Sequence, residues 1–470
     1  MKTNKSSFLK VFYYTAIIFL AACHQEQSQN NKSHSYSKGR VIEKMICKKS
    51  ASQNYSLYLP SSYHPDKAWP VIFFFDAHAR GVLPLSKYKQ LADKYGYILA
   101  GSNNLQNQQV WDEIKYSAQI LLDDVTTRFN IDKRRIYASG FSGGARVASS
   151  LALLGGNFAG IISCAAGFPQ SNDKPKYMFT WFGIVGNEDF NYLEMKNSEL
   201  YLGNSPLKHQ LVIFEGKHDW PPQDIMEEAF LWLEVNAFKE KYEQTNDSLL
   251  FSIRKKFEAQ ISLYEDEHDH VARFIALNKT INFLDGLHDI SSYRKYLAVM
   301  EISKEYQNEK GSETIIENRE YSKQEEYRNA FSAKKVNWWK NEIDGLFNLE
   351  KSKDHKISLM AKRLINYISL IAYMNASGAL NAMNNNATEQ YLQIYKMADP
   401  ENPDFHYLTA CFFAKQNKLQ EALNSLAKAT DYGFADIDKA KEDNNLRSLQ
   451  NHEEFLLLLK KIETNQAGKQ

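Results

Sequence analysis

The chain has 470 residues, 43% of them hydrophobic and 24% charged, so it is long enough to form two domains with separate hydrophobic cores. Its 57 Lys and Arg residues are balanced by 56 Asp and Glu residues. This balance excludes the strongly basic surface that nucleic-acid binding requires, and no nucleic-acid partner is expected.

The N-terminus has the layout of a signal peptide. Lysines within the first ten residues precede an apolar stretch, residues 11–20, which is too short to span a bilayer. The stretch ends in Leu20-Ala21-Ala22-Cys23, which resembles the lipobox of bacterial lipoproteins, where the cysteine receives a diacylglyceryl group. The competing interpretation, a spanning anchor, would need roughly 20 apolar residues. The resemblance implies a signal peptide over residues 1–22 and an exported protein, lipid-anchored at Cys23 to the bacterial cell envelope, in the outer membrane of a Gram-negative cell.

Residues 23–40 are expected to be a flexible tether, because they are rich in Gln, Asn, Ser and Lys and show no apolar periodicity. With Cys23 assigned to lipid, three widely spaced cysteines remain, Cys47, Cys164 and Cys411. An odd and scattered set argues against a disulfide framework. Cys164 lies in a strand-like run and is expected to be a buried, small hydrophobic residue.

The first strongly apolar run after the tether is Trp69–Phe75, and its continuous hydrophobicity predicts a strand buried on both faces of a parallel sheet. It is followed by the small-residue loop 76–81, Asp76-Ala77-His78-Ala79-Arg80-Gly81. The carboxyl ends of strands in a doubly wound sheet share one edge. Residues of this loop are therefore expected at that edge.

The pentapeptide Gly140-Phe141-Ser142-Gly143-Gly144 lies between a strand-like run and a helical run, residues 145–152. This is the pattern of a nucleophile elbow, in which a serine is held on a sharp turn beside a helix N-terminus. The pattern alone is also compatible with a tight turn that has a capping serine. The strand–turn–helix context favours a nucleophilic Ser142.

An acid and a histidine follow the serine, each just after a predicted strand. The run 179–185 precedes a loop with Asn187, Glu188 and Asp189, and the run 210–214 precedes a loop with His218. All three acid-loop residues are candidates for the orienting group, and we expect Asp189. His218 is alternatively a loop histidine packed on Trp220.

The order Ser142, Asp189, His218 resembles that of the α/β-hydrolases, and most closely secreted esterases of the polyhydroxybutyrate-depolymerase and feruloyl-esterase type. These have a similar acid loop and a similar "H-x-W-P" histidine loop. The resemblance implies a doubly wound, mostly parallel sheet over residues 41–239. One departure is that Asp76-Ala77 stands where many relatives have His-Gly.

The resemblance also implies a mechanism. His218 would accept the proton of Ser142, Asp189 would orient the imidazole, and the backbone N–H of Gly143 would form half of an oxyanion hole. The second donor is expected from the backbone of Ala77 or His78. This chemistry needs neither a metal nor a cofactor.

The expected activity is that of a carboxylic-ester hydrolase working through an acyl-enzyme. Short connections around the predicted site indicate an open cleft, which suits bulky esters such as those linked to a polymer or glycan. Two alternatives remain open. One is a serine peptidase with the same triad, and the other is a catalytically inactive, lipid-anchored interaction protein.

The composition changes after residue 239. Gly and Pro become sparse and apolar residues recur at helical spacing, which predicts a helical region over residues 240–350 and an all-α domain over residues 351–470. We expect the helical domain to bind substrate or a protein partner and to contribute no catalytic group. On that basis, a chain without residues 240–470 would still hydrolyse a small ester if its hydrolase domain folded.

The all-α domain over residues 351–470 resembles a tetratricopeptide repeat. One predicted helix starts at Asn402-Pro403-Asp404, and the next has small residues seven apart. The matching positions are Tyr407, Ala410 and Phe413 in the first helix and Ala422, Leu426 and Ala429 in the second. A weaker match comprises Ala387, Tyr391 and Ile394, and residues 436–462 resemble capping helices.

Two further motifs are interpreted as structural. His268 and His270 are two residues apart, and on a helix they would point in different directions, which disfavours a metal site. The pair Trp338-Trp339 is followed by apolar residues at helical spacing, so we expect it in a hydrophobic core and not in a sugar-binding platform.

Overall fold

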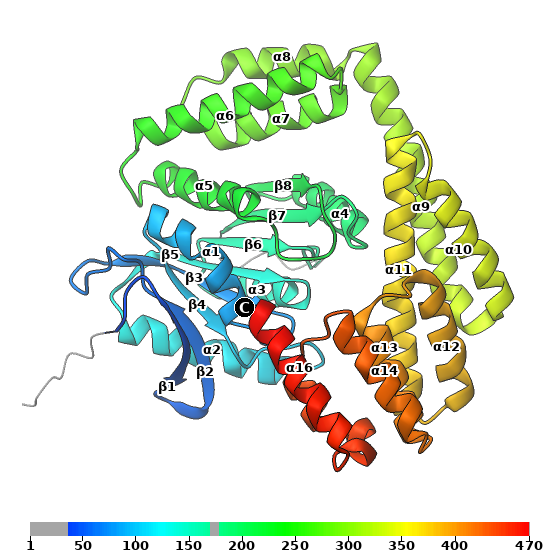
Figure 1. The fold of residues 1–470 in the computed structure, drawn as a ribbon. Coiled ribbons are helices and arrows are strands. Elements are labelled where there is room, and N and C mark those ends of the chain that lie inside the picture. Colours follow the sequence, from blue (N-terminus) through cyan, green and yellow to red (C-terminus); the bar gives the residue numbers. More distant parts are fainter. Residues whose placement is uncertain (1–35, 170–177, 470) are drawn as a thin grey trace, which may run out of the picture. The chain divides into compact units, whose positions relative to one another are not determined.

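The structure, a computed structural model, describes residues 36–169 and 178–469 (Figure 1). The predicted signal peptide and Cys23 lie outside these residues. Within the described ranges, no helix combines the length and the apolar character needed to cross a membrane.

The N-terminal part of the chain contains a sheet whose eight strands run in the order β1-β2-β4-β3-β5-β6-β7-β8. The strands are β1 (Val41–Cys47), β2 (Ser50–Tyr58), β3 (Trp69–Asp76), β4 (Ile98–Ser102), β5 (Ile131–Phe141), β6 (Gly160–Cys164), β7 (Thr180–Gly186) and β8 (His209–Phe214). β2 is antiparallel to both β1 and β4, and all other neighbours are parallel. The predicted mostly parallel, doubly wound α/β sheet is confirmed.

The central strand β3 shows why this region folds as a covered sheet. Every residue from Trp69 to Asp76 is buried. Ile72 and Phe74 pack in one core with α1 (Val82–Tyr95) and α5 (Gln223–Lys239), and alternate side chains point to the opposite face. A continuous apolar run fits a strand with helices on both faces.

The other helices of this region, α2 (Trp111–Arg128), α3 (Gly143–Leu153) and α4 (Tyr192–Gly203), also pack against strands (Figure 1). The parallel register pairs Phe75 with Gly140 and Asp76 with Phe141. The carboxyl ends of β3 and β5 are therefore side by side, which brings the loop after β3 next to the turn that carries Ser142.

The rest of the chain is helical, as predicted from the composition change. The helices are α6 (Asp247–Asp266), α7 (His270–Leu284), α8 (Ser291–Glu301), α9 (Lys304–Ala333), α10 (Val336–Glu350), α11 (His355–Asn381), α12 (Asn385–Ala398), α13 (Pro403–Lys415), α14 (Leu419–Asp431), α15 (Ile437–Glu442), the 3-10 helix η1 (Asn444–Leu449) and α16 (Glu453–Lys469). From Lys38 onward, the sheet and the helices that follow it form one compact unit.

The first helices of this region share a core with the sheet. Phe283 of α7 packs on Trp232 of α5, with ring centroids 5.2 Å apart, and on Phe257 of α6, at 4.9 Å. The same apolar cluster includes Phe182 of β7. Helices α6 and α7 are therefore packed against α5 and, through it, against the sheet.

A second core runs from α9 to α16. Trp339 is fully buried there and packs on Phe331, with ring centroids 4.5 Å apart. Helices α13 and α14 lie side by side, and Tyr407, Ala410, Ala422, Leu426 and Ala429, five of the positions selected for repeat character, are all completely buried. Close helix packing explains the small residues at these positions.

Candidate active site

Ser142 occupies the turn between β5 and α3 with φ 54° and ψ −120°. A positive φ is costly for a serine and is a recognised property of the nucleophile elbow. The flanking glycines allow the turn: a Cβ on Gly140 would lie 2.2 Å from the carbonyl oxygen of Gly144, and a Cβ on Gly144 would lie 2.0 Å from that of Phe75. Neither position has room for a side chain.

The structure brings the three predicted side chains into one chain of hydrogen bonds. Nε2 of His218 lies 3.1 Å from Oγ of Ser142, and Nδ1 lies 3.0 and 2.9 Å from the two carboxylate oxygens of Asp189. A proton on Nδ1 donates to the carboxylate and leaves Nε2 free to accept the serine proton. Asp189 is fully buried, whereas 20% of the His218 side chain is exposed.

The other two acid-loop candidates have different partners. Oδ1 of Asn187 accepts a hydrogen bond of 3.1 Å from the backbone N–H of Gly216, and the carboxylate of Glu188 pairs with Lys362 at 2.7 Å. Asp189 is positioned locally, since it accepts a 2.7 Å bond from the backbone N–H of Asn191. Of the three candidates, Asp189 is the one placed against the imidazole.

The imidazole of His218 contacts two aromatic rings. Its centroid lies 4.1 Å from that of Phe190 and 4.8 Å from that of Phe141. In the alternative interpretation His218 packs on Trp220, whose ring centroid lies 5.6 Å from that of Phe141. Sequence reasoning missed the role of Phe190, although the residue directly follows Asp189. Both rings contact the imidazole next to the atoms that hydrogen-bond with Ser142 and Asp189.

The loop after β3 is organised by the buried carboxylate of Asp76. This carboxylate accepts bonds from Nε and Nη2 of Arg80 at 2.8 and 3.0 Å, and from the backbone N–H of His78 at 2.8 Å. Burial raises the pKa of Asp76, but these hydrogen bonds outweigh it and the net pKa lies below its ordinary value. The N–H of His78 is thus already hydrogen-bonded within the loop, so of the two expected donors Ala77 is the one that Asp76 does not engage.

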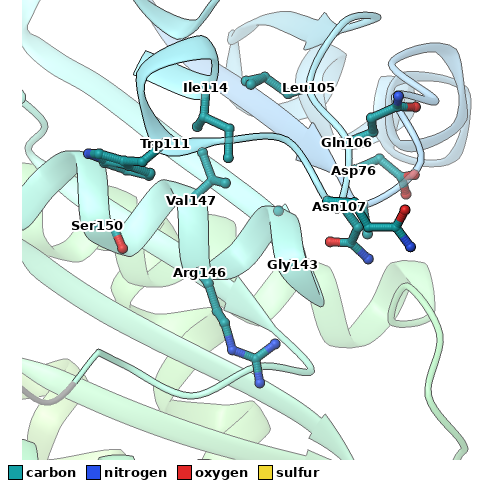
Figure 2. A pocket seen from close by; sticks show the side chains of 13 residues that line it. Asp76, Leu105, Gln106, Asn107, Trp111, Ile114, Gly143, Arg146, Val147 and Ser150 are labelled. Carbon is teal, nitrogen blue, oxygen red and sulfur yellow. The ribbon is translucent and has the colours of Figure 1, made fainter. Parts of the chain in front are cut away.

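A cavity of about 240 Å³ opens beside Gly143 (Figure 2). Its apolar side consists of Leu105, Trp111, Ile114 and Val147, and these side chains cluster together in Figure 2. Asn107 lies close to Gly143, since a Cβ there would be 1.9 Å from Oδ1 of Asn107. The sequence analysis did not identify these wall residues.

One edge of the cavity is polar. Arg146, which lines the cavity from α3, forms hydrogen bonds of 2.7 and 2.8 Å with the carboxylate of Glu194 on α4. The cavity therefore offers an apolar wall near Gly143, the residue that follows Ser142, with the charged Arg146 at one edge. No group of three or more potential metal ligands occurs within residues 36–169 and 178–469.

No protein-family model matches the sequence, and no curated protein matches it. Solved structures do resemble its N-terminal α/β region. An S-formylglutathione hydrolase from Staphylococcus aureus shares 16% identity over 42% of this chain and 98% of its own, with a TM-score of 0.34. A feruloyl esterase module from Clostridium thermocellum, in complex with sinapinate, shares 12% identity over 41% of this chain and 85% of its own, also with a TM-score of 0.34. An esterase from Pyrobaculum calidifontis shares 12% identity over 43% of this chain and 85% of its own, with a TM-score of 0.33.

Proposed function

We propose that this protein is a serine hydrolase that cleaves carboxylic esters. The observation that carries the proposal is the continuous hydrogen-bonded chain from Ser142 through His218 to the buried Asp189. This arrangement gives a serine hydroxyl the adjacent base that it needs to attack a carbonyl carbon.

In the first step, Oγ of Ser142 bonds to the ester carbonyl carbon while its proton moves to Nε2 of His218. The carbonyl oxygen becomes an oxyanion, which the N–H groups of Gly143 and Ala77 stabilise at the N-terminus of α3. The tetrahedral intermediate expels the alcohol, which takes the proton from His218. A water molecule then attacks the acyl-enzyme by the same route and releases the acid and free Ser142.

The cavity supports an ester with an apolar acyl group, because Leu105, Trp111, Ile114 and Val147 line the same cavity as Gly143, which follows the nucleophile. The alcohol side would extend toward solvent, consistent with an ester carried on a polymer or glycan. An amide substrate would follow the same steps, so the activity assays must compare esters with peptide amides.

We also propose that the protein is anchored to the cell envelope by lipid. Lipidation at Cys23 and the tether up to residue 40 would hold the hydrolase on the cell envelope after export. The helices α12–α14, which we propose to form tetratricopeptide-like repeats, would bind a protein partner or the polymeric substrate.

The test is to label purified protein with a fluorophosphonate probe and then to compare acyl and aryl esters with peptide anilides. We expect labelling of Ser142, located by peptide mass spectrometry, and ester turnover with little anilide cleavage. Absence of labelling in folded protein would favour the inactive interaction protein. Faster cleavage of anilides would identify a peptidase.

A further inference from the structure

The helical region contacts the loop that carries Asp189. From α11, Nδ2 of Asn366 donates a 2.8 Å hydrogen bond to the carbonyl oxygen of Glu188, and Nη1 of Arg363 donates a 2.9 Å bond to that of Asn187. Lys362, on the same helix, pairs with the carboxylate of Glu188 at 2.7 Å. The two residues immediately before Asp189 are thus both held by α11.

Arg363 is itself fixed in place. Its Nε and Nη2 bond to the carboxylate of Glu320 on α9 at 2.6 to 3.0 Å, and the two side chains are only 5% and 0% exposed. The guanidinium also lies 4.1 Å from the ring centroid of Tyr192, the first residue of α4. A planar guanidinium with five donors suits this role, because it satisfies Glu320 and still reaches the carbonyl of Asn187.

The same loop is linked to the loop that carries His218. Besides the bond that Oδ1 of Asn187 accepts from the N–H of Gly216, the backbone N–H of Glu188 donates a 2.9 Å hydrogen bond to the carbonyl oxygen of Gly216. A shift of residues 187–189 would therefore move Asp189 and also disturb the segment that precedes His218. Catalytic groups lose much of their effect when they are displaced by a fraction of an ångström.

We propose that Asn366 and Arg363 are positioning residues of the active site, so that the helical region completes the acid side of the triad. This inference rests on the proposed function. The two residues act through the backbone of Asn187 and Glu188 on Asp189, and through Asp189 on His218. It differs from the sequence-based expectation, in which the helical domain serves substrate or partner binding.

The main test is Asn366→Ala, which removes one hydrogen bond and leaves no unpaired charge. With active sites counted by fluorophosphonate titration, we expect kcat per active site for a small activated ester to fall by roughly 3- to 10-fold, the effect of one hydrogen bond. KM should stay unchanged, because Asn366 does not line the cavity. Arg363→Lys keeps a positive charge beside Glu320 but loses the planar guanidinium that also reaches Asn187, and should therefore also lower kcat.

The matched control is Lys323→Met, which removes an ion pair of 2.9 Å with Glu342 inside the helical region. It should leave kcat per active site at the wild-type value. A role limited to stability would reduce the number of titratable sites in Asn366→Ala without changing the turnover of each site. That result would overturn the proposal.

Two measurements show whether Asn366 acts through Asp189. In the Asp189→Asn background, adding Asn366→Ala should cause little further loss of kcat, because Asn366 acts through Asp189 and that contribution is already removed. The downfield proton resonance of His218 Nδ1–H should shift or broaden in Asn366→Ala and stay in place in Lys323→Met. An unchanged resonance with additive kinetic losses would contradict the inference. The resonance can be read even if no ester is turned over, so failure of the proposed function and failure of this inference are separable.

Discussion

The indole Nε1 of Trp220 donates a 2.8 Å hydrogen bond to Oδ2 of Asp76, and both residues are almost completely buried. Trp220 follows His218 by two residues, and Asp76 begins the loop that contains Ala77. The bond therefore joins the histidine loop to the candidate oxyanion loop. Their relative position depends on a contact between residues 144 apart in the sequence.

The first prediction concerns this contact and pH. Asp76→Asn should lower the free energy of unfolding at neutral pH by about 1–3 kcal/mol, because Arg80 and Trp220 lose a charged acceptor. Since the folded-state pKa of Asp76 is depressed, the contribution is complete above its ordinary value of 3.8 and is lost as the pH falls through the lower folded-state pKa. Urea unfolding of both proteins at several pH values measures this. A difference that stays constant down to pH 2 would contradict the prediction.

The second prediction concerns the triad. Ser142→Ala and His218→Ala should each lower ester turnover by roughly 10⁴- to 10⁶-fold, and Asp189→Asn somewhat less, with little change in the thermal midpoint. Glu188→Gln should have a much smaller effect, since this carboxylate pairs with Lys362. Loss of activity in Glu188→Gln together with an active Asp189→Asn would show that the acid is misassigned. Full activity in Ser142→Ala would disprove the mechanism.

The third prediction concerns the apolar cavity. Val147→Phe should fill part of it and lower kcat/KM for a hexanoyl ester about tenfold or more relative to an acetyl ester, because each excluded methylene forfeits about 0.8 kcal/mol. The control is Leu154→Phe, a substitution at a position just after α3 that is 67% exposed. Equal losses for both esters in Val147→Phe would mean that the acyl chain binds elsewhere.

The fourth prediction concerns the lipid anchor. Cys23→Ser should release the protein from the membrane fraction, since the acyl chains would be its attachment to the bilayer. Mass spectrometry of the mature N-terminus decides the matter. An unmodified mature chain that begins at another residue would disprove lipidation at Cys23.

The fifth prediction concerns truncation. The structure changes the expectation that the chain without residues 240–470 keeps small-ester activity. Phe257 and Phe283 share a core with Trp232, and α11 holds the loop of Asp189. The truncated chain should therefore lose both thermal stability and turnover, measured by calorimetry and by ester assay. A stable, fully active truncation would contradict this and the positioning role of Asn366 together.

The sequence by itself was sufficient to predict the α/β fold and to name Ser142, Asp189 and His218 as the candidate triad. The reason is local: continuous apolar runs predict buried strands, and functional side chains in a doubly wound sheet follow the ends of those strands. The change to helical spacing after residue 239 is likewise a local signal, and the structure is helical there.

Only the tertiary structure decided how the site is supported. That the backbone N–H of His78 and the indole of Trp220 both donate to the carboxylate of Asp76 is seen only in the folded chain. The contacts of Arg363 and Asn366 with the acid loop join residues 176 and 178 apart in the sequence. Such pairs leave no periodicity or spacing, because they arise when separately folded elements pack together. The candidate catalytic residues could therefore be selected from the sequence, whereas the contacts that hold the acid loop could not.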